Sequence, residues 1–105
     1  MKDRKPEIID AVIKIMAVKG RRFNTAELAQ SLGHGQSRFL YHYYGSRYDM
    51  ECAAVEHVVD TFSPVDPDYV AVVMQASVSP DLKHLVPVEV LVEAASAHIE
   101  ERMAS

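Results

Sequence analysis

The sequence has a single cysteine, no tryptophan and no long apolar run. Cys52 alone can form neither an internal disulfide nor a cysteine-based zinc site. No stretch of about eighteen apolar residues occurs, so the sequence predicts no transmembrane helix. The charged residues 1–6 are not followed by a long apolar segment with a small-residue cleavage site, as they would be in a secretory signal. We therefore expect a protein of the reducing cytoplasm that does not enter a membrane.

The sequence also lacks the spacing patterns of common catalytic and metal sites. It contains neither a GxxxxGK phosphate-binding loop nor a GxSxG nucleophile turn. Cys52 stands beside Ala53 and Ala54 in a helical stretch, which favours a buried, unreactive thiol. No HxxxH or HxH pair occurs among the five histidines, so we expect no metal ligand; they are His34, His42, His57, His84 and His98. Together with the missing motifs, this leads us to expect no catalytic residue and no cofactor.

The composition is that of a small globular domain with an uneven charge distribution. Its 105 residues are 49% hydrophobic and 25% charged, which are ordinary values for one domain. Residues 1–48 carry nine lysines and arginines against four acids, whereas residues 49–105 carry two against eleven. A basic front and an acidic back predict that the front meets a polyanion. The alternative is a solvated helical surface whose uneven charge serves no partner.

The first two helices are predicted from apolar spacing and from residues that start or stop a helix. Apolar residues three and four apart predict a helix over about residues 5–19. Pro6 suits its first turn, and Gly20 suits its end. Asn24 followed three residues later by Glu27 is a capping-box pattern, which predicts a second helix of about eight residues.

A third short helix is predicted over residues 37–44, after a turn that contains two glycines. Leu40 and Tyr44 lie four residues apart, so we expect them to face inward together. We also expect Tyr41 in the core. The residues left on the outer side of this helix are Arg38, Phe39, His42 and Tyr43.

The second half reads as further helices. Ser46 and Asp49 form another capping box, which predicts a longer fourth helix that ends before Pro64. Asp66 and Pro67 suit the start of a fifth helix, although its valine-rich sequence leaves a strand as the alternative.

A helical turn over residues 81–85 and a last helix from Pro87 to about Met103 complete the chain. The predicted fold is therefore all-α: a three-helix bundle, a longer fourth helix and two to three short C-terminal helices. We assign residues 1–48 to a DNA-binding region. Residues 49–105 would complete the core and form a dimer.

Two short helices around a glycine-bearing turn predict a helix-turn-helix, in which helix 37–44 enters the major groove of DNA. Arg38 can bind a guanine edge or a phosphate, and Phe39 can touch a thymine methyl group. Tyr43 and Arg47 suit phosphates. The predicted DNA-binding residues are Asn24, Thr25, Gln36, Ser37, Arg38, Phe39, His42, Tyr43, Ser46 and Arg47.

The stretch 24–50 resembles the DNA-binding domain of the tetracycline-repressor (TetR) family. The run LYHYYGSR at 40–47 is similar to the end of that family's reading helix and the small pair and cation after it, with Arg47 in place of lysine. The first half, NTAELAQSLG at 24–33, is similar to the family's supporting helix and turn. The resemblance covers about residues 6–60 and implies a transcriptional regulator that acts as a repressor on double-stranded DNA.

The sequence departs from the family pattern on both sides of the turn. The spacing between Gly20 and Ala29 is one residue shorter than usual, and that between Gly33 and Leu40 is one residue longer. Arg38 stands where the family often has glycine. These departures bear on the register of the reading helix and on which side chains face bases.

The part after Phe62 is too short, at 43 residues, to enclose an ordinary small-molecule cavity alone. A small-molecule effector stays open, because a pocket can be built across a dimer. The tail has more apolar residues than one small core easily covers, which predicts a homodimer on two DNA half-sites. The alternative is that they pack on the first and fourth helices; they are Val70, Val73, Val88, Leu91, Val92 and Ile99.

A protein-interaction module is the alternative function. Such a chain would keep the helix-turn-helix fold without binding DNA and would join a partner through its acidic half. Salt distinguishes the two, because the cations of a DNA-binding protein displace counterions and its affinity therefore falls steeply with salt.

Overall fold

The computed structural model describes residues 3–104, with side chains in the last helix described up to Glu100 and at Met103. All secondary-structure elements of this part of the chain are helices, so the predicted all-α fold is confirmed. The α-helices are α1 (Lys5–Lys19), α2 (Thr25–Ser31), α3 (Arg47–Asp60), α4 (Pro67–Ser77) and α5 (Val88–Ala104). Short 3-10 helices cover Gly20–Arg22, Ser37–His42 and Lys83–Leu85.

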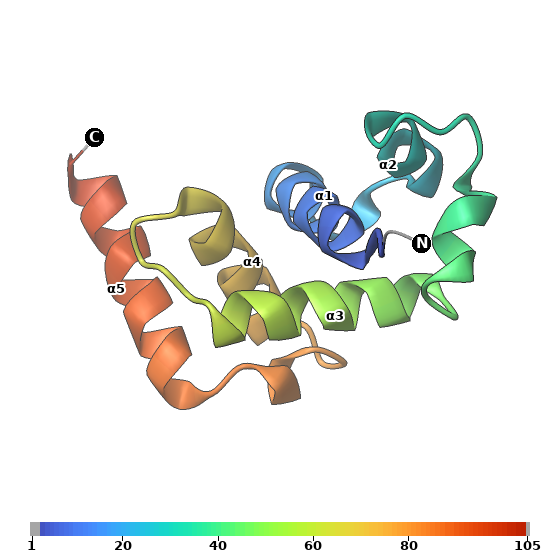
Figure 1. Cartoon of the computed structure of the whole chain (residues 1–105). Coiled ribbons are helices and arrows are strands. Elements are labelled where there is room, and N and C mark those ends of the chain that lie inside the picture. The colour runs from blue at the N-terminus through green and yellow to red at the C-terminus, as the bar shows by residue number, and fades with distance from the viewer. Residues whose placement is uncertain (1–2, 105) are drawn as a thin grey trace.

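The core is built around α1, which packs against α3 and α4 (Figure 1). Phe23 and Leu28 join it from the start of the α2 region, and Leu82 joins it from the segment before α5. One apolar cluster therefore connects the two predicted regions, 1–48 and 49–105. The side chains that α1 buries are Ile8, Ile9, Val12, Ile13 and Met16.

The predicted start and stop residues of the first helices act largely as expected. Helix α1 has the predicted bounds, with Pro6 in its first turn, and ends at Gly20, whose φ of 67° is readily adopted only by glycine. The side chain of Asn24 caps α2 by accepting a hydrogen bond from the Ala26 amide. The capping box is not complete, because the carboxylate of Glu27 pairs with Lys19.

The valine-rich stretch after Asp66 is the helix α4, so the alternative of a strand is wrong. Asp66 accepts hydrogen bonds from the amides of Asp68 and Tyr69, and this cap fixes the first turn. Val70 and Val73, which we expected at a dimer surface, are buried in the core of the chain itself. The alternative, that these residues pack on the first and fourth predicted helices, is correct for them, since α4 lies against α1 and α3.

Helix α5 packs against α4 and leaves much of its apolar surface exposed. Ala94 is its fully buried side chain, and Val90 and Ala97 are half-buried beside it. Within residues 3–104, none of the helices has the length and hydrophobicity needed to cross a bilayer. The exposed apolar residues of α5 are Val88, Val92, Ile99 and Met103, which are 71%, 58%, 56% and 82% exposed.

Candidate nucleic-acid interface

The segment between α2 and α3 carries most of the predicted DNA contacts. The predicted short helix is present, but it is of the 3-10 type and ends before the predicted residue 44. It covers Ser37–His42, after an extended Gln36 whose side chain provides no cap. Its aromatic residues have low helix propensity, and the tighter 3-10 form is typical of such short pieces. The segment lies at the opposite end of the molecule from α5 (Figure 1).

Three residues per turn, in place of 3.6, change which side chains of this segment point inward. Leu40 is fully buried, and Tyr43, three residues later, is half-buried against the core. The prediction of Tyr41 in the core is wrong, because 44% of its surface is exposed. Tyr44 is half-buried as expected, and burial, together with the charge of Asp3, raises the pKa of its phenol.

The outward side of the segment presents polar side chains that can reach a groove of DNA. Gln36, Arg38 and His42 are exposed, as predicted. Tyr41 follows Arg38 by three residues and therefore lies on the same line of the 3-10 helix. A spacing of three is the signal by which Tyr41 could have been found from the sequence. A shallow pocket of about 310 Å³ opens here, lined by His34, Gly35, Gln36, Arg38, Phe39 and His42.

Phe39 is less free than its predicted contact with a thymine methyl group requires. It is half-buried, and its ring stacks on His34 with 3.8 Å between centroids and 15° between planes. The guanidinium of Arg4, at the start of α1, lies 5.4 Å from the same ring centroid. Arg4 also donates to His34 Nε2 at 2.5 Å and to the Leu32 carbonyl at 3.2 Å. The sequence analysis missed Arg4, whose distance of thirty residues from His34 leaves no local signal.

Four other predicted site residues lie at the starts of helices. Asn24 caps α2, and Ser46 caps α3 by accepting a hydrogen bond from the Asp49 amide at 3.1 Å. Thr25 and Ser37 begin α2 and the 3-10 helix and are half-buried. The caps have a structural role already, and the DNA contacts of all four residues stay predictions.

Arg47, the predicted phosphate anchor, is engaged inside the molecule. Its guanidinium lies over the Phe23 ring, 4.1 Å from the centroid, in a cation–π contact. It donates a hydrogen bond to the backbone carbonyl of Arg21, and its Nε lies 3.8 Å from the Glu51 carboxylate. About 35% of the side chain is exposed. The geometry gives Arg47 a packing role at the start of α3, and its phosphate contact stays a prediction.

An ion-pair cluster ties the end of α1 to α3 and to the segment before α5. Glu51, only 3% exposed, accepts from Arg21 Nε at 3.1 Å and from Nη2 at 2.9 Å. The same guanidinium donates to both Asp81 oxygens, at 2.5 and 2.8 Å. The bonds to Glu51 and then Asp81 raise the pKa of Arg21, and its guanidinium lowers the pKa of Asp81. This cluster holds the three charged side chains in place and links three segments of the chain.

Tyr48 and Cys52 lie beside that cluster on α3. The hydroxyl of Tyr48 donates to the Asp81 carbonyl at 2.6 Å. A hydrogen bond with Cys52 is the main cause that raises the pKa of the Tyr48 phenol. Cys52 is half-buried, which is more accessible than the buried thiol we expected.

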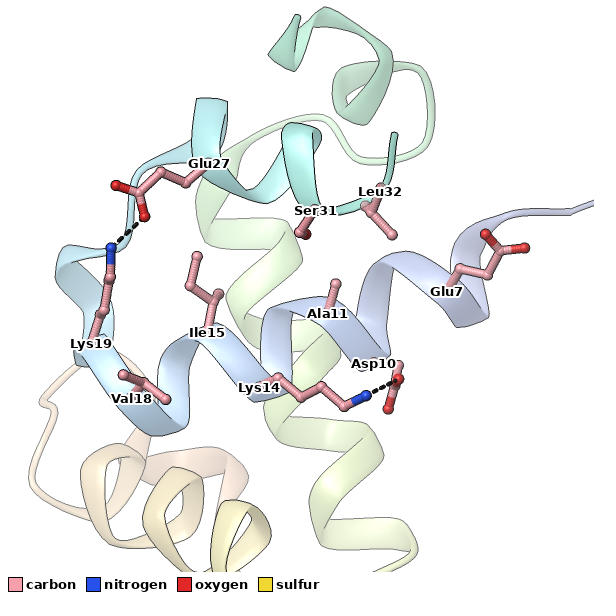
Figure 2. A pocket seen from close by; sticks show the side chains of 10 residues that line it. All are labelled: Glu7, Asp10, Ala11, Lys14, Ile15, Val18, Lys19, Glu27, Ser31 and Leu32. Atoms are coloured by element: carbon pink, nitrogen blue, oxygen red, sulfur yellow. Dashed lines mark hydrogen bonds and ion pairs between the residues drawn. The ribbon is translucent and has the colours of Figure 1, made fainter. Parts of the chain in front are cut away.

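An open groove of about 620 Å³ lies between α1 and α2 (Figure 2). Ile15, Ala11 and Leu32 form an apolar floor between the two helices. Two ion pairs, Lys14 with Asp10 and Lys19 with Glu27, stand at its rim and balance each other's charge. The groove was not predicted from the sequence, because it depends on how far apart two helices pack.

Among the residues that the structure describes, no three histidine, cysteine, aspartate or glutamate side chains gather as metal ligands would. The candidate site therefore consists of the outward side of Ser37–His42 and the residues that hold it. In comparisons with known proteins, the chain matches no family model, no curated protein and no solved structure.

Proposed function

We propose that this protein is a cytoplasmic transcriptional regulator that binds double-stranded DNA as a homodimer, with repression as its mode of action. The observation that carries the proposal is the exposed polar side of Ser37–His42, which follows α2 after a short turn. A major groove that admits an α-helix also admits the slimmer 3-10 helix.

The chemistry of this side suits base edges. Arg38 is exposed and can form two parallel hydrogen bonds with the O6 and N7 atoms of a guanine. The amide of Gln36 can pair in the same way with an adenine. His42 and Tyr41, also exposed, can reach neighbouring bases or phosphates.

Basic residues next to the segment supply attraction for the DNA backbone. Lys5 is exposed, and its Nζ lies 5.9 Å from the ring centroid of Tyr44. The charge balance of the whole chain points the same way, since nine of its eleven lysines and arginines precede residue 49. Arg21 and Arg47 of this half pair with acids of the other half, so the cations that remain for a polyanion include the exposed Lys5 and Arg38.

The homodimer is assigned to α5. Its exposed apolar residues, Val88, Val92, Ile99 and Met103, follow one another by four, seven and four positions and therefore share one face. A helix with an exposed apolar stripe is typically covered by another element. Because α5 lies at the far end from Ser37–His42, pairing through it leaves both reading segments open to DNA (Figure 1).

Fluorescence anisotropy with a pool of random DNA duplexes tests the proposal. The wild type is measured at several salt concentrations beside Arg38→Gln, with Lys83→Gln as the matched control. Lys83 is an exposed cation in the segment before α5, so the control removes the same charge from an element that carries none of the predicted DNA contacts. Arg47 is unsuitable, because its substitution would disturb the packing on Phe23.

Binding that weakens steeply with salt supports the proposal, since each phosphate contact adds about −0.9 to the slope of log affinity against log salt. Arg38→Gln should lose about 1–3 kcal/mol on selected sites and relax the sequence preference at one position. Lys83→Gln should bind as the wild type does. An absence of binding at low salt, from a protein that circular dichroism shows to be helical, would contradict the proposal.

A protein-interaction module is the second candidate, and the groove between α1 and α2 is the observation that favours it. Its apolar floor and charge-balanced rim suit a peptide helix more than a polyanion. This candidate predicts no salt-sensitive DNA binding. It becomes the better explanation if the anisotropy experiment finds none in the folded protein.

A further inference from the structure

We propose that Arg4 and His34 are positioning residues for the DNA-reading segment, and that they hold it only while His34 is neutral. The DNA part of this inference rests on the proposed function; the positioning of the segment does not.

Arg4 joins three parts of the molecule that are far apart in the sequence. From the start of α1, it donates to His34 Nε2 at 2.5 Å, to the Leu32 carbonyl at 3.2 Å and to Glu7 at 3.2 Å. His34 in turn stacks on Phe39, within the 3-10 helix, at 3.8 Å. The contacts form a chain from α1 through the turn after α2 to the reading segment.

The contact from Arg4 requires a lone pair on His34 Nε2. A guanidinium nitrogen can only donate, so His34 Nε2 must accept and carry no proton. The ring is then neutral, with its proton on Nδ1. A proton on Nε2 would remove the acceptor and place a second positive charge against Arg4.

The surroundings of His34 oppose that second charge. Arg38 and His42 line the same shallow pocket from the 3-10 helix, and Arg4 faces the ring from α1. Glu7 is the carboxylate on this side, and it pairs with Arg4. Because cations outnumber the carboxylate around the ring, protonation of His34 favours separation of Arg4 from His34.

Opening would loosen the reading segment at its start, where Gln36 makes no capping bond. Leu40 is the fully buried side chain of the 3-10 helix, and Phe39, Tyr43 and Tyr44 are half-buried against the core. A segment released from His34 no longer presents Arg38 and His42 in a fixed arrangement. Acid should therefore weaken sequence-specific binding, which is the opposite of the usual gain when a histidine near DNA acquires charge.

The experiment measures affinity for a selected DNA site at pH 7.5 and 5.5, and amide hydrogen-exchange protection of the free protein at both values. The variants are His34→Gln, which keeps a neutral acceptor, and Arg4→Lys, which keeps the charge but not the bridging geometry. His57→Gln, on the exposed side of α3, is the control.

We expect wild-type affinity to fall on acidification by up to about tenfold per pH unit, the limit for one coupled proton. His34→Gln should show no such fall, and His57→Gln should show all of it. Arg4→Lys should bind about tenfold more weakly at pH 7.5 with an unchanged salt slope, the effect of one lost charge-assisted hydrogen bond. The Tyr43 and Tyr44 amides bond to the Leu40 carbonyl. Their exchange protection should be lower at pH 5.5 than at pH 7.5 in the wild type, and it should not change between these pH values in His34→Gln.

The inference is overturned if His34→Gln keeps the pH response of the wild type, or if protection of residues 34–44 does not change with pH. If no DNA binds at either pH, the proposed function fails and the exchange measurement alone decides on the positioning role. If DNA binds and protection is independent of His34, the positioning role fails and the proposed function stands.

Discussion

Helices α1 and α5 have similar sequence patterns and opposite environments. Both are amphipathic, with apolar residues three and four positions apart. Helix α1 fully or nearly fully buries five side chains, whereas the described side chains of α5 include one such residue, Ala94. The comparison shows that an apolar stripe identifies a surface to be covered and does not identify what covers it.

The difference follows from position in the bundle. Helix α1 lies among α2, α3 and α4, so neighbours surround its apolar face (Figure 1). Helix α5 comes last and packs mainly on α4, with Val90, Ala94 and Ala97 turned toward it. The rest of its apolar surface faces outward, which is the basis for assigning the homodimer to α5.

The largest expected effect comes from α1. Met16→Ala removes a fully buried side chain at the centre of the core and should lower the free energy of unfolding by about 2–5 kcal/mol. The melting temperature, followed by circular dichroism, should fall by at least about 8 °C. Ile99→Ala, at 56% exposure, is the matched change in α5 and should stay within about 0.5 kcal/mol in the monomer. Similar losses from the two variants would contradict the contrast between the helices.

The next largest effect tests whether polar contacts also anchor the neighbourhood of α1. Glu51→Gln weakens the paired hydrogen bonds from Arg21, which follows α1, and should reduce stability by about 1.5–3 kcal/mol in urea unfolding. The loss should be greater than for Glu56→Gln, a matched change at an exposed glutamate of the same helix. Equal effects would mean that the buried ion pair contributes no more than a surface charge.

The third prediction concerns association through α5. Val92→Glu combined with Ile99→Glu places two charges on the exposed stripe and should convert the dimer to a monomer in sedimentation velocity. The melting temperature of the monomer should hardly change, since both side chains are more than half exposed. Val78→Glu, at 79% exposure but outside α5, is the control and should remain dimeric. A monomeric wild type, or a dimer that survives the double substitution, would show that α5 is not the interface.

The sequence predicted elements whose limits are set by local chemistry. The bounds of α1, the caps at Asn24, Ser46 and Asp66, and the helical fold class are all confirmed. It did not predict the 3-10 helix, because a preference for 3.0 rather than 3.6 residues per turn depends on how tightly both ends are held. For this reason Tyr41 was predicted in the core and lies at the surface, whereas Tyr43 was predicted on the outer side and is half-buried against the core.

The candidate site was predicted in part for the same reason. Exposure of Arg38 and His42 is confirmed, since polar and charged side chains mostly stay in contact with water. The contacts of Arg47 with Phe23 and of Arg4 with His34 link residues more than twenty positions apart. No local pattern encodes such pairs, so they become visible only when the helices have been packed.

The smallest expected effect is on the melting temperature and comes from the ion pair of Arg21 with Asp81. This pair links the segment after α1 to the segment before α5. Arg21 lowers the pKa of Asp81 below its ordinary value, so the folded state favours the charged carboxylate. The resulting stability is present at neutral pH and is lost as the pH falls below about 4, where the unfolded chain binds the proton more readily. Asp81→Asn should therefore melt slightly below the wild type at pH 7, and the difference should shrink toward pH 3.

Because the carboxylate is about half exposed, added salt should also reduce the difference at pH 7. A difference that persists at pH 3 would show that the substitution acts through the packing of the side chain and not through its charge.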